Sequence, residues 1–197
     1  MFTLSFCAAG CGRPAFSGST LCAIHSASPE AEAQRLGELM INKKVVKDIC
    51  AQGLHFMDMD FSYRQFLGCT FTGASFSNCI FSGATMRMCY FDFTTLSSTD
   101  FCSSDMQFLS FAGAGIKECS FEGSELLNIN FNGASIFDSL FNNTNLYNSR
   151  FVSANLKNSS FSDCNLKRTN FVKSNRENIS YKSSNTAEAI FEMEEYN

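Results

Sequence analysis

The sequence of 197 residues contains only two histidines, two prolines and no tryptophan. Histidine is the side chain most often used for general acid–base catalysis. His25 lies within a cysteine-rich motif and His55 stands alone, so neither belongs to a recognisable catalytic set. A glycine-rich phosphate loop, a nucleophile elbow and a pair of neighbouring catalytic acids are missing as well. These absences predict a protein that is not an enzyme.

Long hydrophobic runs are also missing. No stretch approaches the ~20 apolar residues of a membrane-spanning helix, and the first residues lack the basic and apolar regions of a secretory signal. The ten cysteines do not indicate disulfides, because several share one repeat position with alanine and serine, where a thiol acts as a small hydrophobe. This usage fits a reducing compartment. We therefore expect a cytoplasmic protein without a membrane partner.

The chain does contain a strict period of five. Every fifth residue from Phe56 to Phe171 is Phe, Met, Leu or Ile, over 24 positions without an exception. This period fits neither the 3.6 residues of a helical turn nor the two-residue alternation of a strand. It is typical of a solenoid, in which each short unit buries one face by stacking on the next. The aromatic residues are therefore expected in a core.

Two other positions of each unit are also restricted. The residue two before each large one is mostly Ala, Ser, Thr or Cys, and the residue two after it is often Gly, Asn or Asp. Side chains two apart on an extended chain point the same way, so each unit sends one large and one small side chain inward. Gly, Asn and Asp tolerate left-handed backbone. A corner is therefore expected once per unit.

This pattern resembles the pentapeptide-repeat family, whose consensus is A-[D/N]-[L/F]-X-X. The stretches 154–158 and 74–78 match it directly, and the resemblance covers roughly residues 52–185. It implies an all-β solenoid, a right-handed quadrilateral β-helix in which four units make one turn. Recurrence at twenty residues, as in Met86 and Met106 or Ile116 and Ile136, supports four units per turn. The 24 units then give six turns and two stacked columns of phenylalanine.

The amino-terminal segment carries the one motif with site chemistry. Cys7, Cys11, Cys22 and His25 follow the spacing C-x3-C-x10-C-x2-H. Three thiolates and one imidazole make a closed tetrahedral set for structural Zn²⁺, and two close pairs let a short chain fold around the ion. The segment resembles short zinc knuckles with a G-C-x-R-P core on bacterial and phage proteins, although those have four residues between the first two cysteines. An unmetallated tail remains the alternative.

The two ends of the solenoid need caps, because an open end exposes core and unpaired strand edges. Ser28, Pro29 and Glu30 predict a helix start, with a helix to about Met40. We divide the chain into a zinc knuckle (1–27), a capping helix and lead-in (28–51), the β-helix (52–185) and a carboxy-terminal cap or tail (186–197). Residues 187–196 are expected to form a short helical lid.

The first function hypothesis is a non-catalytic scaffold that binds an unidentified protein. Several outward positions are apolar, and Leu127, Phe137 and Tyr147 are the expected contact, since exposed apolar clusters mark partner surfaces. Scattered surface hydrophobes are the alternative. A second copy of the chain is a further expected partner, through a solenoid end. The zinc knuckle could also be the docking element, displayed by the shaft.

The second hypothesis is mimicry of DNA. Some pentapeptide-repeat proteins resemble duplex DNA and bind type II topoisomerases, which protects gyrase from quinolones. Here Asp58, Glu118 and Asp138 fall in one column, but other residues interrupt it. Residues 150–182 carry seven basic and two acidic side chains, which opposes docking on a basic DNA-binding surface. Residues 54–149 carry nine acidic and three basic ones, so direct nucleic-acid binding by the shaft is not expected. The charge asymmetry is otherwise that of an ordinary solvated surface.

Overall fold

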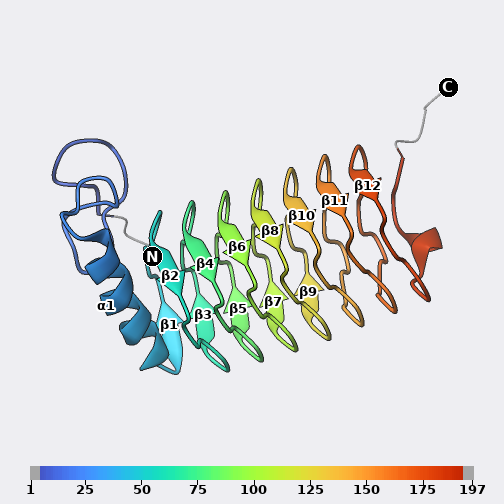
Figure 1. The fold of residues 1–197 in the computed structure, drawn as a ribbon, viewed down its shortest axis with the longest axis horizontal. Helices are drawn as coiled ribbons and strands as arrows, with labels where there is room; N and C mark the ends of the chain where they lie inside the picture. The colour runs from blue at the N-terminus through green and yellow to red at the C-terminus, as the bar shows by residue number, and fades with distance from the viewer. Residues whose placement is uncertain (1–4, 193–197) are drawn as a thin grey trace.

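The computed structural model describes residues 5–192, which form one helix followed by a long stack of short coils (Figure 1). The elements are α1 (Pro29–Ile41), β1 (Val45–Lys47), β2 (His55–Met57), β3 (Gln65–Leu67), β4 (Ser75–Ser77), β5 (Thr85–Arg87), β6 (Thr95–Ser97), β7 (Asp105–Gln107), β8 (Gly115–Lys117), β9 (Glu125–Leu127), β10 (Ser135–Phe137), β11 (Asn155–Lys157), β12 (Asn175–Glu177) and the 3₁₀ helix η1 (Thr186–Glu188). Within residues 5–192, no helix has the length and apolar character needed to cross a membrane.

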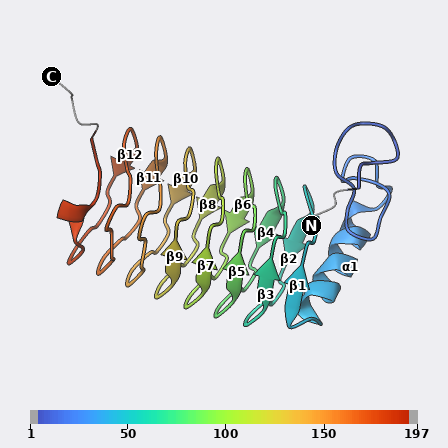
Figure 2. The ribbon, with the colours of Figure 1, turned by 180° about the vertical axis from the view of Figure 1, so that it is seen from behind.

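The strands form two parallel sheets on opposite sides of the stack, seen from behind in Figure 2. Five strands run in the order β1-β3-β5-β7-β9, and seven run in the order β12-β11-β10-β8-β6-β4-β2. Each strand from β1 to β11 pairs with the chain twenty residues further on, as in Phe56 with Phe76. Isolated bridges such as Thr70 with Tyr90 and Asp60 with Ile80 build the other two sides. The predicted four-sided β-solenoid is confirmed.

The solenoid is longer than the sequence predicted. β1 pairs with β3, and Val46 and Ala51 are both buried, so the paired coils begin at Val45 rather than 52. Ala51 occupies a position where the repeat has a large residue, and its small side chain is the reason why the repeat was not recognised there. Its backbone N–H nevertheless donates to the carbonyl of Thr70 over 2.9 Å, as in every later coil. The seven strands of the larger sheet correspond to about seven turns instead of six.

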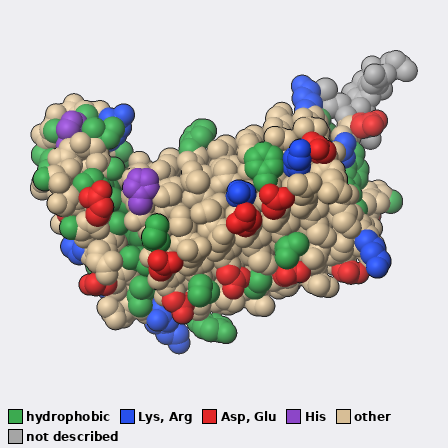
Figure 3. Space-filling model, viewed as in Figure 1, with side chains coloured by type: hydrophobic (Ala, Val, Ile, Leu, Met, Phe, Trp, Pro, Cys, Tyr) green, Lys and Arg blue, Asp and Glu red, His purple; other side chains and the backbone are tan. Residues whose placement is uncertain are grey.

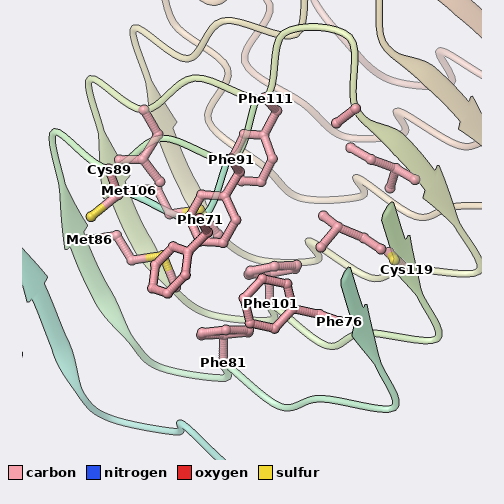
Figure 4. Packing of buried hydrophobic residues seen from close by; sticks show 14 of the residues in the cluster. Phe71, Phe76, Phe81, Met86, Cys89, Phe91, Phe101, Met106, Phe111 and Cys119 are labelled. Atoms are coloured by element: carbon pink, nitrogen blue, oxygen red, sulfur yellow. The ribbon is translucent and has the colours of Figure 1, made fainter. Parts of the chain in front are cut away.

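The interior is filled by the large side chains of the repeat, and the two predicted phenylalanine columns are present (Figure 4). Within one column Phe101 and Phe121 stack with centroids 4.9 Å apart and planes 3° apart. Across the core Phe101 and Phe111 meet edge to face, at 6.3 Å and 87°. The strand spacing of ~4.8 Å sets the first distance, and the ring quadrupole favours the second geometry. The interior therefore has no room for a ligand.

The corners adopt the left-handed backbone that the sequence predicted, with φ of 51° at Asp138 and 65° at Gly113. Bulky residues occupy some of the same corners, among them Tyr63 and Phe93, at φ of 57° and 56°. Their rings lie over a glycine of the next coil. A Cβ added to Gly113 would meet the Phe93 ring at 2.7 Å. At these two corners the ring therefore occupies the space that a side chain of the next coil would need.

Helix α1 covers the amino-terminal end of the core, as predicted, with Ala33, Leu36 and Met40 buried. It begins at Pro29 and ends one residue beyond the predicted end. Ser28 occupies the N-cap position, but its side chain makes no capping hydrogen bond, so that part of the prediction is wrong. Gly37 faces Met59 so closely that a Cβ would lie 2.3 Å from the sulfur. A larger residue at position 37 would therefore displace the flexible end of the Met59 side chain.

At the other end, the described residues do not form the expected helical lid. The three-residue helix η1 is followed by extended chain, in which Ile190 bridges to Asn170. Phe191 then stacks on Phe171 at 5.2 Å and 9°. The five-residue period places Phe191 at a large position, so packing continues the coil instead of starting a helix. Residues 193–196 of the expected lid lie outside the described residues.

Strand β6 offers a test of which residues of the repeat point into the core. Leu96 is fully buried, whereas its neighbour Thr95 is exposed. We expect Leu96→Ala to lower the free energy of unfolding by about 2–5 kcal/mol, because it leaves a cavity in a close-packed core. Thr95→Ala should change it by less than about 0.5 kcal/mol. Urea denaturation measures both, and equal losses would contradict this assignment.

The reactivity of the cysteine thiols tests the same assignment of inward and outward positions. Cys69, Cys79 and Cys89 are fully buried in the small inward position, whereas Cys102 is half-exposed. Burial raises the pKa of Cys119 and of Cys164, each to about 11, so neither forms a reactive thiolate at neutral pH. Iodoacetamide should therefore label Cys102 before any of these five in the native protein. Peptide mass mapping would contradict this if the buried thiols were modified without prior unfolding.

Candidate metal centre

The amino-terminal segment folds into two tight turns that face each other. In the first, the N–H of Gly10 donates to the carbonyl of Cys7 over 3.0 Å. Gly10 and Gly12 have φ of 71° and 72°, which side chains disfavour. The bridge between Phe6 and Pro14 closes this loop. The glycines thereby bring the thiol of Cys11 back towards that of Cys7.

The second turn contains the other two ligand candidates. The N–H groups of His25 and Ser26 both donate to the carbonyl of Cys22, over 3.1 and 2.9 Å. This single turn places the imidazole of His25 beside the Cys22 thiol. The N–H of Ala8 donates to the carbonyl of Thr20 over 2.8 Å and joins the two turns. Four side chains from distant parts of the segment therefore converge.

The distances among the four ligand atoms match the edges of a metal tetrahedron. All lie within 4.8 Å of one another. The Cys11 and Cys22 sulfurs are 3.7 Å apart, and Nδ1 of His25 is 3.5 Å from the Cys7 sulfur and 3.6 Å from the Cys22 sulfur. Zinc bonds of ~2.3 Å to sulfur and ~2.0–2.1 Å to nitrogen imply edges of roughly 3.5–3.8 Å. The predicted Cys₃His group is thus positioned to bind a metal ion through Nδ1.

The surroundings of Cys22 favour the thiolate form that a metal requires. Burial raises the pKa of Cys22, but the backbone N–H groups of Ile24 and His25 and the neighbouring thiols lower it by a larger amount. The resulting pKa of Cys22 is about 6. Burial raises the pKa of Cys7. Cys7 and Cys22 are buried, whereas His25 is exposed. Within residues 5–192 this is the one cluster of three or more His, Cys, Asp or Glu side chains with such geometry.

The metal-binding segment is attached to both the helix and the first coil. Phe16 is buried in the main core. Ser17 exchanges two hydrogen bonds with Cys50, through its N–H at 3.0 Å and its Oγ at 2.8 Å. Arg35 of α1 donates to the Ser17 carbonyl over 2.6 Å. In Figure 3 the segment projects beyond the profile of the shaft at one end. The segment and the shaft are therefore joined by specific contacts.

The structure does not bring the three predicted partner residues together. Leu127 and Tyr147 stack in one column, since the N–H of Asn128 donates to the Tyr147 carbonyl. Phe137 belongs to β10 of the seven-stranded sheet, whereas Leu127 belongs to β9 of the five-stranded sheet. Ten residues are half a turn, so Phe137 lies on the opposite side, and a single face with these three residues is wrong. All three are only partly exposed.

Other apolar side chains are far more exposed. Tyr63 is 74%, Phe93 69%, Phe108 61% and Met88 60% exposed. All four lie at corners, two residues after a large inward position. Tyr63 and Met88 depart from the Gly, Asn or Asp expected at corners, and their exposure was not predicted from the sequence. The signal was available, because a large apolar residue at a position that favours left-handed backbone departs from the repeat.

His55 faces solvent on β2, with Nδ1 2.5 Å from Oγ of Ser75 one coil away. The pair lies on the exposed surface of the seven-stranded sheet. Within the described residues, no acidic side chain forms a hydrogen bond with His55, so the third member of a catalytic triad is missing. The arrangement is that of two stacked surface side chains.

Comparison with known families agrees with the repeat. Residues 114–191 match the family described as Pentapeptide repeat region, and residues 60–87 match Pentapeptide repeats (8 copies). Together these matches span more than half of the chain. The chain belongs to the pentapeptide-repeat family. A search of curated proteins found no match.

Solved pentapeptide-repeat structures resemble the shaft. HetL of the cyanobacterium Nostoc sp. strain PCC 7120, involved in heterocyst differentiation regulation, is 14% identical, with 80% of this chain and 95% of HetL covered and a TM-score of 0.41. Rfr23 of the cyanobacterium Cyanothece 51142 is 12% identical, with 80% and 99% covered and a TM-score of 0.38. Full-length QnrB1, a plasmid-mediated fluoroquinolone resistance protein, is 14% identical, with 71% and 83% covered and a TM-score of 0.38.

The metal centre makes a quantitative prediction. Protein purified without chelator should contain one metal ion per chain, and Cys22→Ser should lose most of it, because it removes the buried thiol that contacts two other ligands. Elemental analysis measures the content, and Cys102→Ser is the matched control outside the site. Native protein without bound metal, or equal loss in both variants, would contradict the assignment.

Proposed function

We propose that this protein is a non-catalytic scaffold for protein–protein interaction, built on the β-solenoid and stabilised at one end by a structural Zn²⁺ ion. The observation that carries the proposal is the filled interior. The large inward side chains from Phe56 to Phe171 are at most 1% exposed, so ligands can meet only the outer surface. Several large apolar side chains stand on that surface, and such groups anchor protein interfaces.

Zinc is the metal that best fits the donor set. Three thiolates and one imidazole with tetrahedral edges suit Zn²⁺, and a closed set of four protein ligands leaves no open position for catalysis. Phe16 and Ser17 lie between Cys11 and Cys22 in the chain and contact the core and Cys50. Metal binding would therefore hold the amino-terminal cap on the first coil. Its role is structural.

The partner is a protein, and the compartment is the cytoplasm. All ten cysteines are free thiols, which fits a reducing compartment. A second copy of the chain is a further candidate partner at the carboxy-terminal end, because among residues 5–192 β12 is the last strand of its sheet and pairs on one edge. The Leu127–Tyr147 column remains the proposed contact on the side of the shaft, without Phe137.

Mimicry of DNA ranks second. Asp58 and Asp138 stand at equivalent corners, but each carboxylate accepts a hydrogen bond from the Asn of the next coil, Asn78 or Asn158. Neutral side chains thus separate some of the charges and interrupt a phosphate-like ladder. In Figure 3 the basic side chains of the shaft gather towards its carboxy-terminal end, which would repel a basic DNA-binding surface. Direct binding of nucleic acid by the shaft is disfavoured because residues 54–149 are predominantly acidic and would repel phosphates.

The scaffold proposal predicts a partner that depends on the shaft surface. Tagged protein captured from its own cytosol should retain a specific partner, and Leu127→Lys combined with Tyr147→Lys should lose it at an unchanged urea midpoint. The lysines add charge to a desolvated contact. Phe137→Lys on the opposite side is the matched control. Identification by mass spectrometry tests the capture.

A supercoiling assay separates the scaffold from the mimic. We expect micromolar protein to leave DNA gyrase activity and its quinolone sensitivity unchanged. Specific inhibition or protection would promote the mimic to first place. Capture of no partner by any form of the protein would remove the support for the scaffold.

A further inference from the structure

One edge of the shaft carries an unbroken row of corner residues at positions 48, 68, 88, 108, 128, 148 and 168. The backbone shows that they stack. The N–H of each corner donates to a carbonyl of the next coil, as in Gly68 to Arg87 over 3.0 Å, Phe108 to Leu127 over 3.1 Å and Asn148 to Lys167 over 3.1 Å. Its residues Asn128 and Asn148 directly follow Leu127 and Tyr147, so the row lies beside the Leu127–Tyr147 column.

Two surface hollows follow one another along this row. The first, of about 320 Å³, is lined by Asp48, Gly68, Met88 and Tyr90. The second, of about 260 Å³, is lined by Phe108, Asn128, Asn148 and Arg150. The two hollows share no lining residue, but they lie end to end along the row, and we call the surface that contains both of them the corner groove. With strands ~4.8 Å apart, the five coils from position 48 to position 148 span roughly 24 Å.

The chemistry of the corner groove changes along its length. Asp48 lies at one end. Met88, Tyr90 and Phe108 form an apolar middle, and they are 60%, 52% and 61% exposed. The row then continues with two asparagines, and Arg150 lies at the far end. A ligand that fills this groove therefore needs a cation at one end, apolar groups in the middle and an anion at the other end.

The charges at both ends are available for a ligand. Within residues 5–192, the side chains of Asp48 and Arg150 form no ion pair and no hydrogen bond. Some other surface charges are paired, such as Lys157 with Glu177 at 2.9 Å. Arg168, the next corner of the row, donates to the Tyr147 hydroxyl over 3.1 Å. Its guanidinium adds a second positive charge beside the far end.

The apolar middle is unfavourable for the free protein in two ways. Met88 and Phe108 hold left-handed backbone, at φ of 52° and 58°, and both expose most of their apolar surface. At other corners the ring of Tyr63 or Phe93 covers a glycine of the next coil. Phe108 is followed by Asn128 instead. Backbone strain combined with apolar exposure is frequent at binding sites.

The two asparagines supply backbone-like hydrogen bonds. Nδ2 of Asn148 donates to Oδ1 of Asn128 over 2.6 Å. Nδ2 of Asn128 and Oδ1 of Asn148 have no partner within the described residues. One amide therefore offers a donor and the other an acceptor at adjacent coils. An extended peptide presents a C=O and an N–H to such a pair.

We propose that the corner groove binds an extended segment of a partner protein, with a basic residue, then large apolar residues, then an acidic residue. This inference rests on the proposed scaffold function and names the class of partner. At ~3.3 Å per residue, 24 Å corresponds to roughly seven or eight residues. The basic residue meets Asp48, the apolar residues meet Met88 and Phe108, and the acidic residue meets Arg150. A nucleic acid fits less well, because Asp48 and the apolar middle provide no partner for phosphates.

The test measures binding of a designed probe to the full-length protein by fluorescence anisotropy. The probe is Lys-Ser-Ser-Leu-Ser-Phe-Ser-Glu with blocked ends and a fluorescein label, together with the same peptide in reversed order, because the groove does not set the chain direction. We expect saturable binding in the roughly micromolar range for one of them. Replacing Leu and Phe of the probe by Ser should weaken it at least about tenfold.

Variants of the protein locate the site. Phe108→Asn keeps a residue that favours the corner backbone and removes the apolar anchor, so binding should fall about tenfold. Phe93→Asn makes the same change at another exposed corner outside the groove and should leave binding within about twofold. Arg150→Glu should weaken the probe about tenfold and recover affinity for a probe whose Glu is replaced by Lys. This recovery requires a folded variant, so it excludes misfolding as the cause of the loss.

Several outcomes would overturn the inference. These are no saturable binding of either probe, equal losses in Phe93→Asn and Phe108→Asn, absence of the charge-swap recovery, and tighter binding of a labelled oligo-dT than of the probes. The scaffold proposal is judged separately by partner capture. A captured partner that the probe does not displace supports the scaffold and rejects this groove as its contact. Binding of the probe without any captured partner supports the groove as a peptide site and leaves the scaffold without support.

Discussion

The parallel pairing of each residue with the one twenty positions later governs this structure. It places like side chains directly above one another at ~4.8 Å, which suits flat rings, such as Phe101 over Phe121 at 4.9 Å. The same register stacks corner on corner and amide on amide, as in Asn158 with Asp138 and Asn178. Because every coil depends on its neighbours, stability is a sum over adjacent coils, and the free ends are its weakest points.

The two ends are closed in different ways. At the amino-terminal end, α1 lays Leu36 and Met40 on the core and Gly37 permits close approach. The Cys₃His segment then fastens its own Ser17 to Cys50 of the first coil. At the carboxy-terminal end, Arg176 occupies a large inward position with its guanidinium carbon 4.8 Å from the centre of the Phe191 ring. The Tyr181 hydroxyl is buried without a hydrogen-bond partner among the described residues. The amino-terminal closure therefore has the more complete polar pairing.

The five-residue period predicted the core, the corners and the four-sided coil, because each of these depends on side-chain size at a fixed spacing. The Cys₃His site was predictable for a similar reason, since ligand type and short spacings limit how the loops can close. The boundaries were less predictable. Ala51 is small but follows the coil, and Phe191 continues it where a helix was expected. The single face predicted for Leu127, Phe137 and Tyr147 was wrong, because grouping residues by exposure ignores the side of the square on which each one lies.

The positions that the repeat leaves free carry what is particular to this chain. Inward positions carry either a large apolar residue or a small residue, and most corners carry Gly, Asn or Asp. A bulky residue in left-handed backbone costs of the order of 1–3 kcal/mol, and a contact with the next coil can offset part of this cost. Tyr63 and Phe93 find one over glycines of the next coil. Met88 and Phe108 lie beside the open hollows of the corner groove, between an unpaired Asp48 and an unpaired Arg150 among the described residues. For these two residues, a bound partner is the contact that would compensate both the backbone strain and the apolar exposure.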